Sequence, residues 1–258
     1  VSLVASYLKT IYPNISTYIP DRYGEGYGVS FKGIDFAEDN NFSLIIALDC
    51  GTKALEKVAY ATEKRIDFII CDHHKPGGEL PKAVAILNPK RTDCYYPFDE
   101  LCGCGVGFKL IQALGKNRQQ SIADFVPYLD LVATAIAADI VPINGENRTL
   151  AYFGLQVINS NPRNGIKAII HQTKKEVLTI TDVVFIVAPR INAAGRMKHG
   201  NYAVELLTEM DFDAAAEFAA SIEIFNADRK ELDKKITDEA IIQIIDNEEE
   251  KGFSTVVY

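Results

Sequence analysis

The sequence Leu44-Ile-Ile-Ala-Leu-Asp49 is followed, after one helix-sized segment, by Phe68-Ile-Ile-Cys-Asp-His-His74. Each stretch is a short apolar run that ends in polar side chains, and Asp72 follows Asp49 by 23 residues. Continuous apolar runs of this length are typical of parallel strands that are buried on both faces. Because residues 52–64 have a helical composition, the pattern predicts a strand–helix–strand unit and an α/β fold with a parallel sheet.

Polar side chains follow both predicted strands where each strand ends. Since parallel strands leave a sheet at one edge, Asp49 should lie beside Asp72, His73 and His74, at the edge where open α/β sheets bind ligands. Carboxylates beside imidazoles suit a divalent metal. Asp49 alone also fits a helix cap, and two histidines after a strand also fit a surface loop. Their combination one repeat apart favours a metal-binding or catalytic site.

The rest of the chain extends this pattern on both sides. Two further short strands are predicted at residues 15–19 and 84–87. The second half is mostly helical, and the predicted helices cover residues 106–114, 122–138 with Pro127 inside, 150–158 and 166–172. From Asp213 to Asn247 the chain contains neither Gly nor Pro, and its apolar residues recur at nearly helical periods. A helix of that length is unusual inside a compact domain and often connects two bodies.

Asp139 is a further candidate ligand. It ends the apolar stretch 131–138, where an Ala-rich helix has no need of a carboxylate. The alternative is a charge that turns the chain toward solvent.

The segment Ala188-Pro-Arg-Ile-Asn-Ala-Ala-Gly-Arg-Met197 is a candidate binding segment, since residues 183–204 contain no acidic side chain. Arginine suits bidentate contacts with phosphate, and an amide side chain or a backbone N–H would add donors. The alternative is a surface loop with ordinary solvated charges. The candidate binding residues are Arg190, Asn192, Gly195 and Arg196.

Composition limits the classes of protein that fit. Of the 258 residues, 48% are apolar and 24% are charged, which is typical of a globular protein with a sizeable core. No apolar run approaches the ~20 residues that span a bilayer. The five Cys, none at zinc-site spacing, predict a reducing, cytoplasmic location. The net charge of −8 disfavours a broadly basic surface but allows a local basic groove for nucleic acid.

Several short motifs are spread in order over nearly the whole chain. They are Tyr18-Ile-Pro-Asp-Arg22 with Gly26-Tyr-Gly28, Leu48-Asp-Cys-Gly51, Cys71-Asp-His-His74, Cys102-Gly-Cys-Gly-Val-Gly-Phe-Lys109, Asp130-Leu-Val-Ala-Thr-Ala-Ile-Ala-Ala-Asp139, Glu146-Asn-Arg148 and residues 188–197. Together they resemble the DHH phosphoesterase superfamily, and within it the RecJ-type exonucleases. The Asp-His-His triplet alone is weakly specific, whereas residues 190–197 are much more specific to RecJ-type members.

The resemblance implies a role for each candidate. Asp49 is similar to a carboxylate that bridges two metals, and His73 and Asp139 are similar to ligands of one of them. His74 resembles the residue that faces the scissile phosphate, and Asp72 resembles a partner that orients the imidazoles. The residues that resemble contacts to phosphate or to the strand are Arg190, Asn192, Gly195 and Arg196.

The resemblance also implies a reaction. It is a two-metal hydrolysis that uses manganese, with magnesium as second choice, and removes mononucleotides from single-stranded DNA in the 5′-to-3′ direction during DNA repair and recombination. A single-strand-binding protein or a helicase would be a further partner, and a membrane would not. Two alternatives stay open. One is a related phosphodiesterase for short oligoribonucleotides or cyclic dinucleotides, and the other is a non-catalytic scaffold that binds nucleic acid.

The same resemblance divides the chain. We expect a DHH phosphoesterase domain at residues 1–212, with an α/β part at 1–143 and a mostly helical part at 144–212. A connector helix is expected at 213–252, and residues 253–258 would begin a truncated C-terminal domain. The superfamily's Asp-x-Asp motif would precede Val1, so the chain as given should bind metal weakly.

Overall fold

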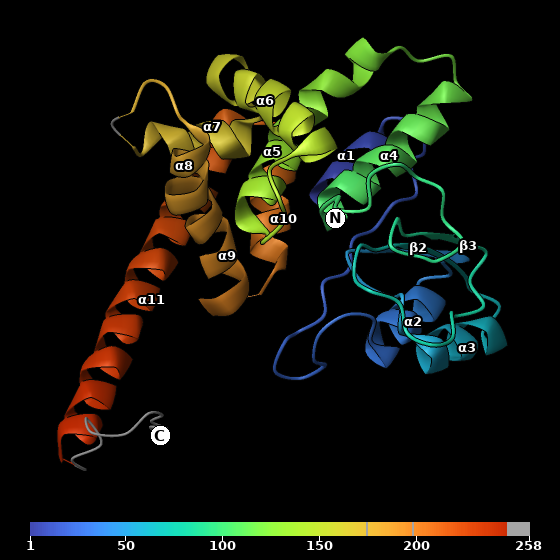
Figure 1. Ribbon diagram of the computed structural model, residues 1–258, viewed down its shortest axis with the longest axis horizontal. Coiled ribbons are helices and arrows are strands. Elements are labelled where there is room, and N and C mark those ends of the chain that lie inside the picture. The colour runs from blue at the N-terminus through green and yellow to red at the C-terminus, as the bar shows by residue number, and fades with distance from the viewer. Residues whose placement is uncertain (174, 198, 247–258) are drawn as a thin grey trace.

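The computed structural model describes residues 1–173, 175–197 and 199–246. Within them, three parallel strands form one sheet in the order β1 (Leu44–Leu48), β2 (Asp67–Cys71) and β3 (Ala85–Leu87) (Figure 1). Leu48 pairs with Cys71, and Cys71 pairs with Leu87, so the strands end in register. The predicted parallel sheet is therefore confirmed, and the polar residues after each strand leave it at one edge.

The strand predicted at residues 15–19 is wrong, because this segment has no regular secondary structure. Pro13 and Pro20 lie on either side of it. Its Tyr18 hydroxyl donates to Glu25 (2.8 Å), so the side chain binds within its own loop. A run of five residues was too short a signal to separate an ordered loop from an edge strand.

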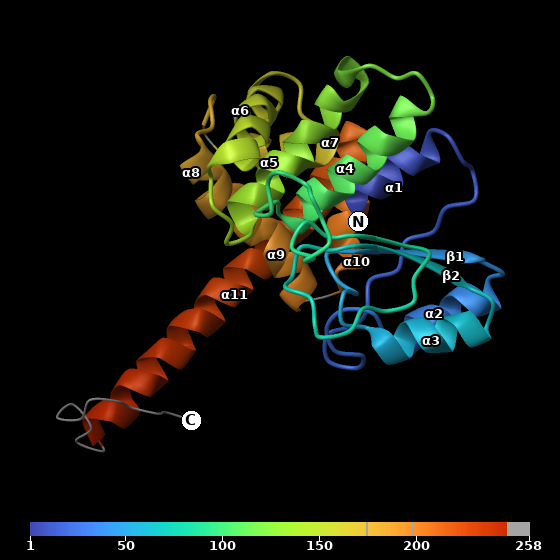
Figure 2. The same cartoon turned by 45° about the vertical axis from the view of Figure 1, so that its right-hand side comes forward.

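Helices cover both faces of the sheet (Figure 2). On one face lie α2 (Phe31–Asp39) and α3 (Leu55–Glu63), and on the other lie α1 (Ser2–Lys9) and α4 (Gly103–Lys116). A small apolar core fills the first interface, and burial of each large aliphatic or aromatic side chain stabilises such a core by roughly 1.5–3 kcal/mol. Its members include Ile34, Val58, Ala61, Phe68 and Ile70.

A second, larger core continues from α1 and α4 into the helical part of the molecule. The elements there are η1 (Ile122–Tyr128), α5 (Leu129–Ala138), α6 (Gly145–Ser160), α7 (Asn164–His171), α8 (Ile180–Asp182), η2 (Val183–Val187), α9 (Ala188–Met197) and α10 (Asn201–Thr208).

Two details of this part differ from the expectation. The helix predicted over 122–138 is divided into the 3₁₀ turn η1 and the helix α5, because Pro127 has no backbone N–H to donate. Residues 188–197 form the helix α9, so the alternative of a surface loop is wrong. The capping box of Thr179 and Asp182 begins the run of helix that leads into it.

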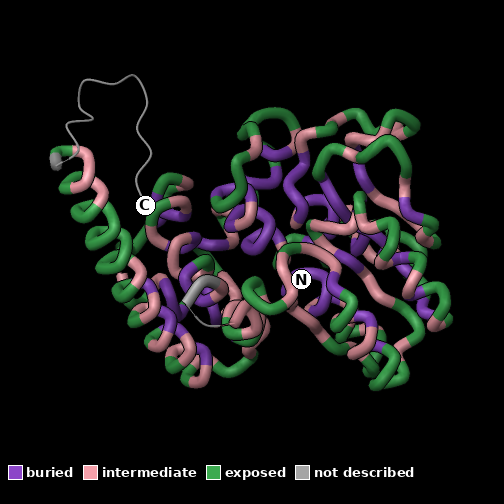
Figure 3. Tube along the Cα trace, turned by 90° about the horizontal axis from the view of Figure 1, so that it is seen from below, coloured by how far each residue is buried: buried purple, intermediate pink, exposed green. Residues whose placement is uncertain are grey.

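The helix α11 (Phe212–Asp246) has 35 residues and is roughly 50 Å long at about 1.5 Å per residue. Its inner turns bury Ala215, Ala219 and Ile222 in the large core. Its outer turns extend away from the body, where Figure 3 shows them mainly as exposed and intermediate residues. The predicted long helix is confirmed, whereas residues 247–258, including the predicted start of a domain at 253–258, lie outside the described residues. Across the described part of the chain, no helix is long and apolar enough to cross a membrane.

Candidate metal centre

The end of β1 directs the Asp49 carboxylate over the edge of the sheet. The backbone N–H of Asp49 still donates to the Cys71 carbonyl (2.7 Å), as in the strand. Its φ is +65°, and Gly51 follows with φ +109°. This left-handed conformation costs most residues free energy, but Asp tolerates it because its short polar side chain bonds locally. The turn therefore leaves the carboxylate 60% exposed at the carboxyl edge of the sheet.

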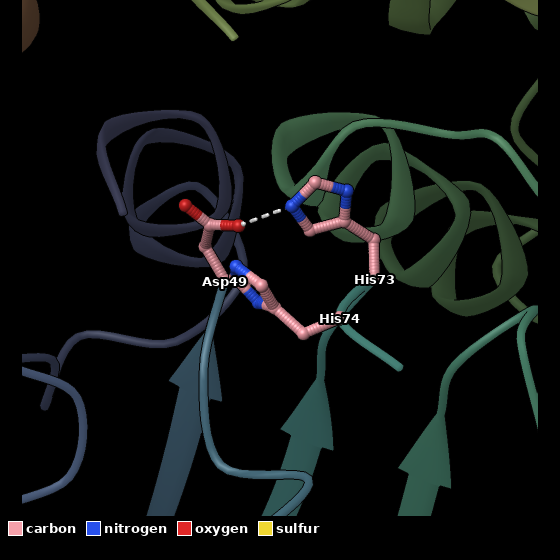
Figure 4. A group of neighbouring side chains, drawn as sticks. All are labelled: Asp49, His73 and His74. Atoms are coloured by element: carbon pink, nitrogen blue, oxygen red, sulfur yellow. Dashed lines mark ion pairs between the residues drawn. The ribbon is translucent and has the colours of Figure 1, made fainter. Parts of the chain in front are cut away.

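His73 is the meeting point of the site. Its Nε2 lies 3.2 Å from Asp49 Oδ1 and 3.4 Å from Asp139 Oδ2, while its side chain is only 10% exposed. Asp139 arrives from the C-terminal end of α5, so one ligand candidate comes from the helical part. Figure 4 shows Asp49, His73 and His74 above the ends of the strands, and their candidate ligand atoms lie within 4.8 Å of one another.

Asp72 is buried beneath this cluster and holds the two histidines. Its Oδ1 accepts from the backbone N–H of His73 (2.8 Å) and of His74 (3.2 Å), and it lies 2.7 Å from His74 Nδ1. Its Oδ2 accepts from Thr52 N (3.0 Å). Burial alone would raise the pKa of Asp72, but these hydrogen bonds outweigh it and hold the pKa below its ordinary value. Because an ionised carboxylate only accepts, Nδ1 of His74 carries the proton and Nε2 is left for the site.

Thr52 and Asn88, which contact Asp72 and the His74 backbone, were not predicted from the sequence. Asn88, which is buried, donates from Nδ2 to Thr52 Oγ1 (2.9 Å) and to the His74 carbonyl (2.8 Å). It directly follows β3, as Asp49 and Asp72 follow β1 and β2. Asp49 and Asp72 were found as polar residues that directly follow a predicted strand. The same criterion applied to the strand at residues 84–87 would have found Asn88 as well.

Neighbouring carboxylates and burial act in opposite directions on the pKa of His73, and the net pKa is raised. The hydrogen bond with Asp49 raises the pKa of His73, burial opposes this, and the charges of Asp49 and Asp139 raise it further. Its buried Nδ1 has no hydrogen-bond partner among the described residues. Two carboxylates that face one imidazole nitrogen are a donor set that suits manganese or magnesium better than a soft metal.

Three thiols near the cluster have raised pKa values. Burial, together with the carboxylates of Asp72 and Asp49, raises the pKa of Cys50 to about 11. Burial likewise raises the pKa of Cys71 to about 12 and that of Cys104 to about 11. A thiol binds metals as a thiolate, so these side chains pack as small apolar groups at neutral pH.

A cavity of about 290 Å³ opens beside the cluster. It is lined by Asp49 and Asp139, by the first turn of α4 and by Asn192 from α9. The structure thus brings Asn192 of the predicted binding segment to the same space as two candidate ligands. Among the described side chains, this is the one from residues 188–197 that lines the cavity.

The other predicted binding residues have different surroundings. Arg190 is paired with Glu223 of α11 and donates from Nη1 to the Ile186 carbonyl (2.8 Å), so its guanidinium is occupied within the protein. A Cβ placed on Gly195 would lie 3.8 Å from Arg22 Nη2, which puts the loop 13–30 beside α9. Arg196 is in the last turn of α9, and its side chain lies outside the described residues.

Fold and site together define an α/β protein with a carboxylate–histidine cluster, suited to hold a metal, at the carboxyl edge of a parallel sheet. Comparison with known families specifies it further: the pattern of the DHH family, N-terminal domain, matches residues 1–136. The chain belongs to the DHH family, which confirms the resemblance drawn from its motifs.

Relatives place the chain more closely within the family. It is 39% identical over 242 residues to the single-stranded-DNA-specific exonuclease RecJ of Bacillus subtilis (strain 168), and this covers 93% of the chain and 30% of that protein. It is 35% identical over 240 residues to the protein of the same name from Escherichia coli (strain K12), covering 88% of the chain and 42% of that protein. The chain therefore spans less than half the length of these relatives.

Solved structures agree. A crystal structure of exonuclease RecJ bound to manganese superposes with a TM-score of 0.85 at 27% identity, over 94% of this chain and 61% of that one. RecJ from Thermus thermophilus in complex with Mn²⁺ superposes with a TM-score of 0.81 at 24% identity, over 94% and 35%, which supports the fold alone. The expected DHH-type α/β fold is confirmed.

Proposed function

We propose that the protein is a manganese-dependent exonuclease that hydrolyses single-stranded DNA from the 5′ end to mononucleotides, in DNA repair and recombination. The observation that carries the proposal is the convergence of Asp49 and Asp139 on His73 beside a cavity. The names of the relatives, which are single-stranded-DNA-specific exonucleases, support the substrate.

In this proposal Asp49, His73 and Asp139 hold the metal. Manganese is the first choice and magnesium the second, in line with the metals named for the RecJ structures. A divalent metal, when bound, supplies Lewis-acid chemistry that activates water and stabilises charge on a phosphate. Asp49 and Asp139 both line the cavity, and the proposal that Asp49 would hold two metals comes from the family resemblance.

The protein's own groups would orient the phosphodiester. Asp72 fixes the ring of His74 through its contact with Nδ1. The other ring nitrogen, Nε2, would then face the scissile phosphate. Thr52 and Asn88 hold Asp72 and the His74 backbone in turn, which limits the ring to one direction. His74 is the proposed catalytic residue, and Asp72 acts through it.

The binding segment would hold the strand. Asn192 would add an amide donor inside the cavity, and Gly195 and Arg196 would contact the strand from the end of α9. Arg190 is proposed as a strand contact from its sequence motif, although its ion pair with Glu223 would have to open for this. The same proposal includes a single-strand-binding protein or helicase as partner and a cytoplasmic location. It also includes a phosphoesterase domain at residues 1–212 and a connector helix at 213–252.

Digestion of 5′- and 3′-labelled single-stranded DNA with manganese tests it, using this chain and a version extended at both ends to the length of its relatives. We expect metal-dependent release of mononucleotides from the 5′ end by the extended version. A duplex of the same sequence serves as the control substrate and should resist. Faster cleavage of dinucleotides or short oligoribonucleotides would favour the small-substrate phosphodiesterase, and no cleavage of any substrate would favour a scaffold.

A further inference from the structure

The first turn of α4 touches the metal centre at Gly103, which none of the proposed roles uses. A Cβ built on Gly103 would lie 2.0 Å from Asp49 Oδ1, 2.4 Å from its Cγ and 2.7 Å from its Cβ. The oxygen nearest to that position is the one that pairs with His73 Nε2. The space beside Gly103 is therefore the space in which the Asp49 carboxylate lies.

Rotation of the aspartate alone cannot relieve this contact. The Cβ of Asp49 is itself too close, and its place is fixed by the backbone. That backbone has φ +65° and is held by the hydrogen bond from Asp49 N to the Cys71 carbonyl (2.7 Å). A side chain on residue 103 would thus have to move a strand end or a helix end.

The start of α4 is held equally firmly. Cys102 is fully buried, and its Sγ accepts from Gly105 N (3.3 Å) as the N-cap. Just before it, the Glu100 carbonyl accepts from Asn147 Nδ2 (2.6 Å). The same amide donates to the Pro142 carbonyl (3.0 Å), three residues after Asp139, so Asn147 ties α4 to the turn that carries another ligand candidate.

We propose that Gly103 is a positioning residue of the metal centre: by having no side chain, it sets the place and direction of the Asp49 carboxylate toward His73 and the metal. This inference rests on the proposed function only in naming a metal as the group that Asp49 holds. The contact between residues 49 and 103 stands apart from any activity.

Manganese titration of the metal-free, full-length protein by calorimetry tests the assignment, with Gly103→Ala compared against Gly105→Ala. A Cβ on Gly105 meets its nearest atom at 3.4 Å, so the control changes the same helical turn without the collision. We expect Gly103→Ala to weaken manganese binding by about 10-fold or more, as loss of a group that orients a ligand does, and Gly105→Ala to change it little. Wild-type affinity in a folded Gly103→Ala protein would overturn the proposal.

A double-mutant cycle of thermal stability covers the case in which Gly103→Ala is too unstable for titration, or in which the wild type itself binds no manganese. Asp49→Gly suits the left-handed backbone and removes the atoms that collide. Gly103→Ala should lower the thermal midpoint in the wild-type background. In the Asp49→Gly background the same substitution should leave the midpoint nearly unchanged. An equal loss in both backgrounds would refute the coupling. Manganese binding without DNA cleavage by the wild type would instead overturn the proposed function and leave the role of Gly103 standing.

Discussion

The strand-end cluster and the helix α9 were both singled out from the sequence, yet they differ in how the structure uses their charges. Asp49 and His73, which follow β1 and β2, face Asp139 from the end of α5, and the two carboxylates line the cavity. On α9, Arg190 is paired with Glu223 of α11. The first group keeps its charged atoms available to a ligand, whereas the second uses at least one cation inside the protein.

The difference follows from geometry. Parallel strands in register bring the residues after each strand to one edge, so their neighbours are known once the strands are known. A helix distributes its side chains around an axis, and which of them meets a neighbour depends on packing partners far along the chain. Glu223 lies 33 residues from Arg190, and no local pattern marks the pair.

Replacement of Asp49 should have the largest effect, because its carboxylate is the one proposed to serve both metals. We expect Asp49→Asn to lower the rate of single-strand cleavage by about 100-fold or more. Single-turnover digestion with saturating manganese measures this. Asp39→Asn, at the exposed end of α2, is the matched control. A wild-type rate for Asp49→Asn would remove the strand ends from the site.

Asp72→Asn tests whether the buried Asp72 orients His73 and His74. The change replaces an acceptor by an amide that faces the N–H groups of Thr52, His73 and His74. We expect manganese affinity to fall about 10- to 100-fold and the free energy of unfolding to fall by about 1–3 kcal/mol. Calorimetric titration and urea denaturation measure the two effects.

The control for that change is Asp67→Asn, since Asp67 is an exposed carboxylate at the opposite end of the same strand. It should leave both quantities nearly unchanged. Loss of stability in Asp72→Asn without any loss of affinity would reduce Asp72 to a purely structural residue.

The two arginines of α9 provide a smaller and more specific test. We expect Arg196→Ala to weaken single-strand binding and to make the plot of log affinity against log salt shallower by about 0.7, which is the value for one phosphate contact. Arg190→Ala should lower the free energy of unfolding by about 1 kcal/mol through loss of the contacts to Glu223 and the Ile186 carbonyl. It should make the slope shallower by less than Arg196→Ala does, because the ion pair with Glu223 must open before Arg190 contacts the strand. Fluorescence anisotropy at several salt concentrations separates the two variants, and an unchanged slope for Arg190→Ala would remove Arg190 from the strand contacts.

The smallest expected effect concerns pH in the metal-free protein. The pKa of His73 is raised from 6.5 by the hydrogen bond with Asp49, so its protonated form favours the folded state. This stabilisation is fully present below the ordinary pKa and is lost as the pH rises through the raised one. The thermal midpoint of wild type should therefore exceed that of His73→Gln by more at about pH 5.5 than at about pH 9. A gap that widens with rising pH would contradict the assignment.

How well the sequence predicts each feature of the fold and the site depends on how far apart along the chain the contacting residues lie. Asp49, Asp72 and His73 directly follow two apolar strands that are one strand–helix repeat apart. Their place at the sheet edge, and their nearness to one another, could therefore be predicted from short stretches of sequence. Asp139 stood out as a carboxylate after an apolar stretch, but its place beside His73 could not be read locally, because it depends on how α5 packs against α4. Gly103 could not be identified at all, since the feature that matters is an absent side chain opposite a residue 54 positions away.

The left-handed backbone of Asp49 also decides how the site can be silenced for structural work. At φ +65° an alanine is strained, whereas asparagine adopts this conformation readily and matches aspartate in shape. Asp49→Asn should therefore remove the charge without disturbing the turn, the strand end or the space beside Gly103. It is the substitution of choice for trapping an uncleaved oligonucleotide in a crystal, and an alanine at this position would mix lost charge with a refolded loop.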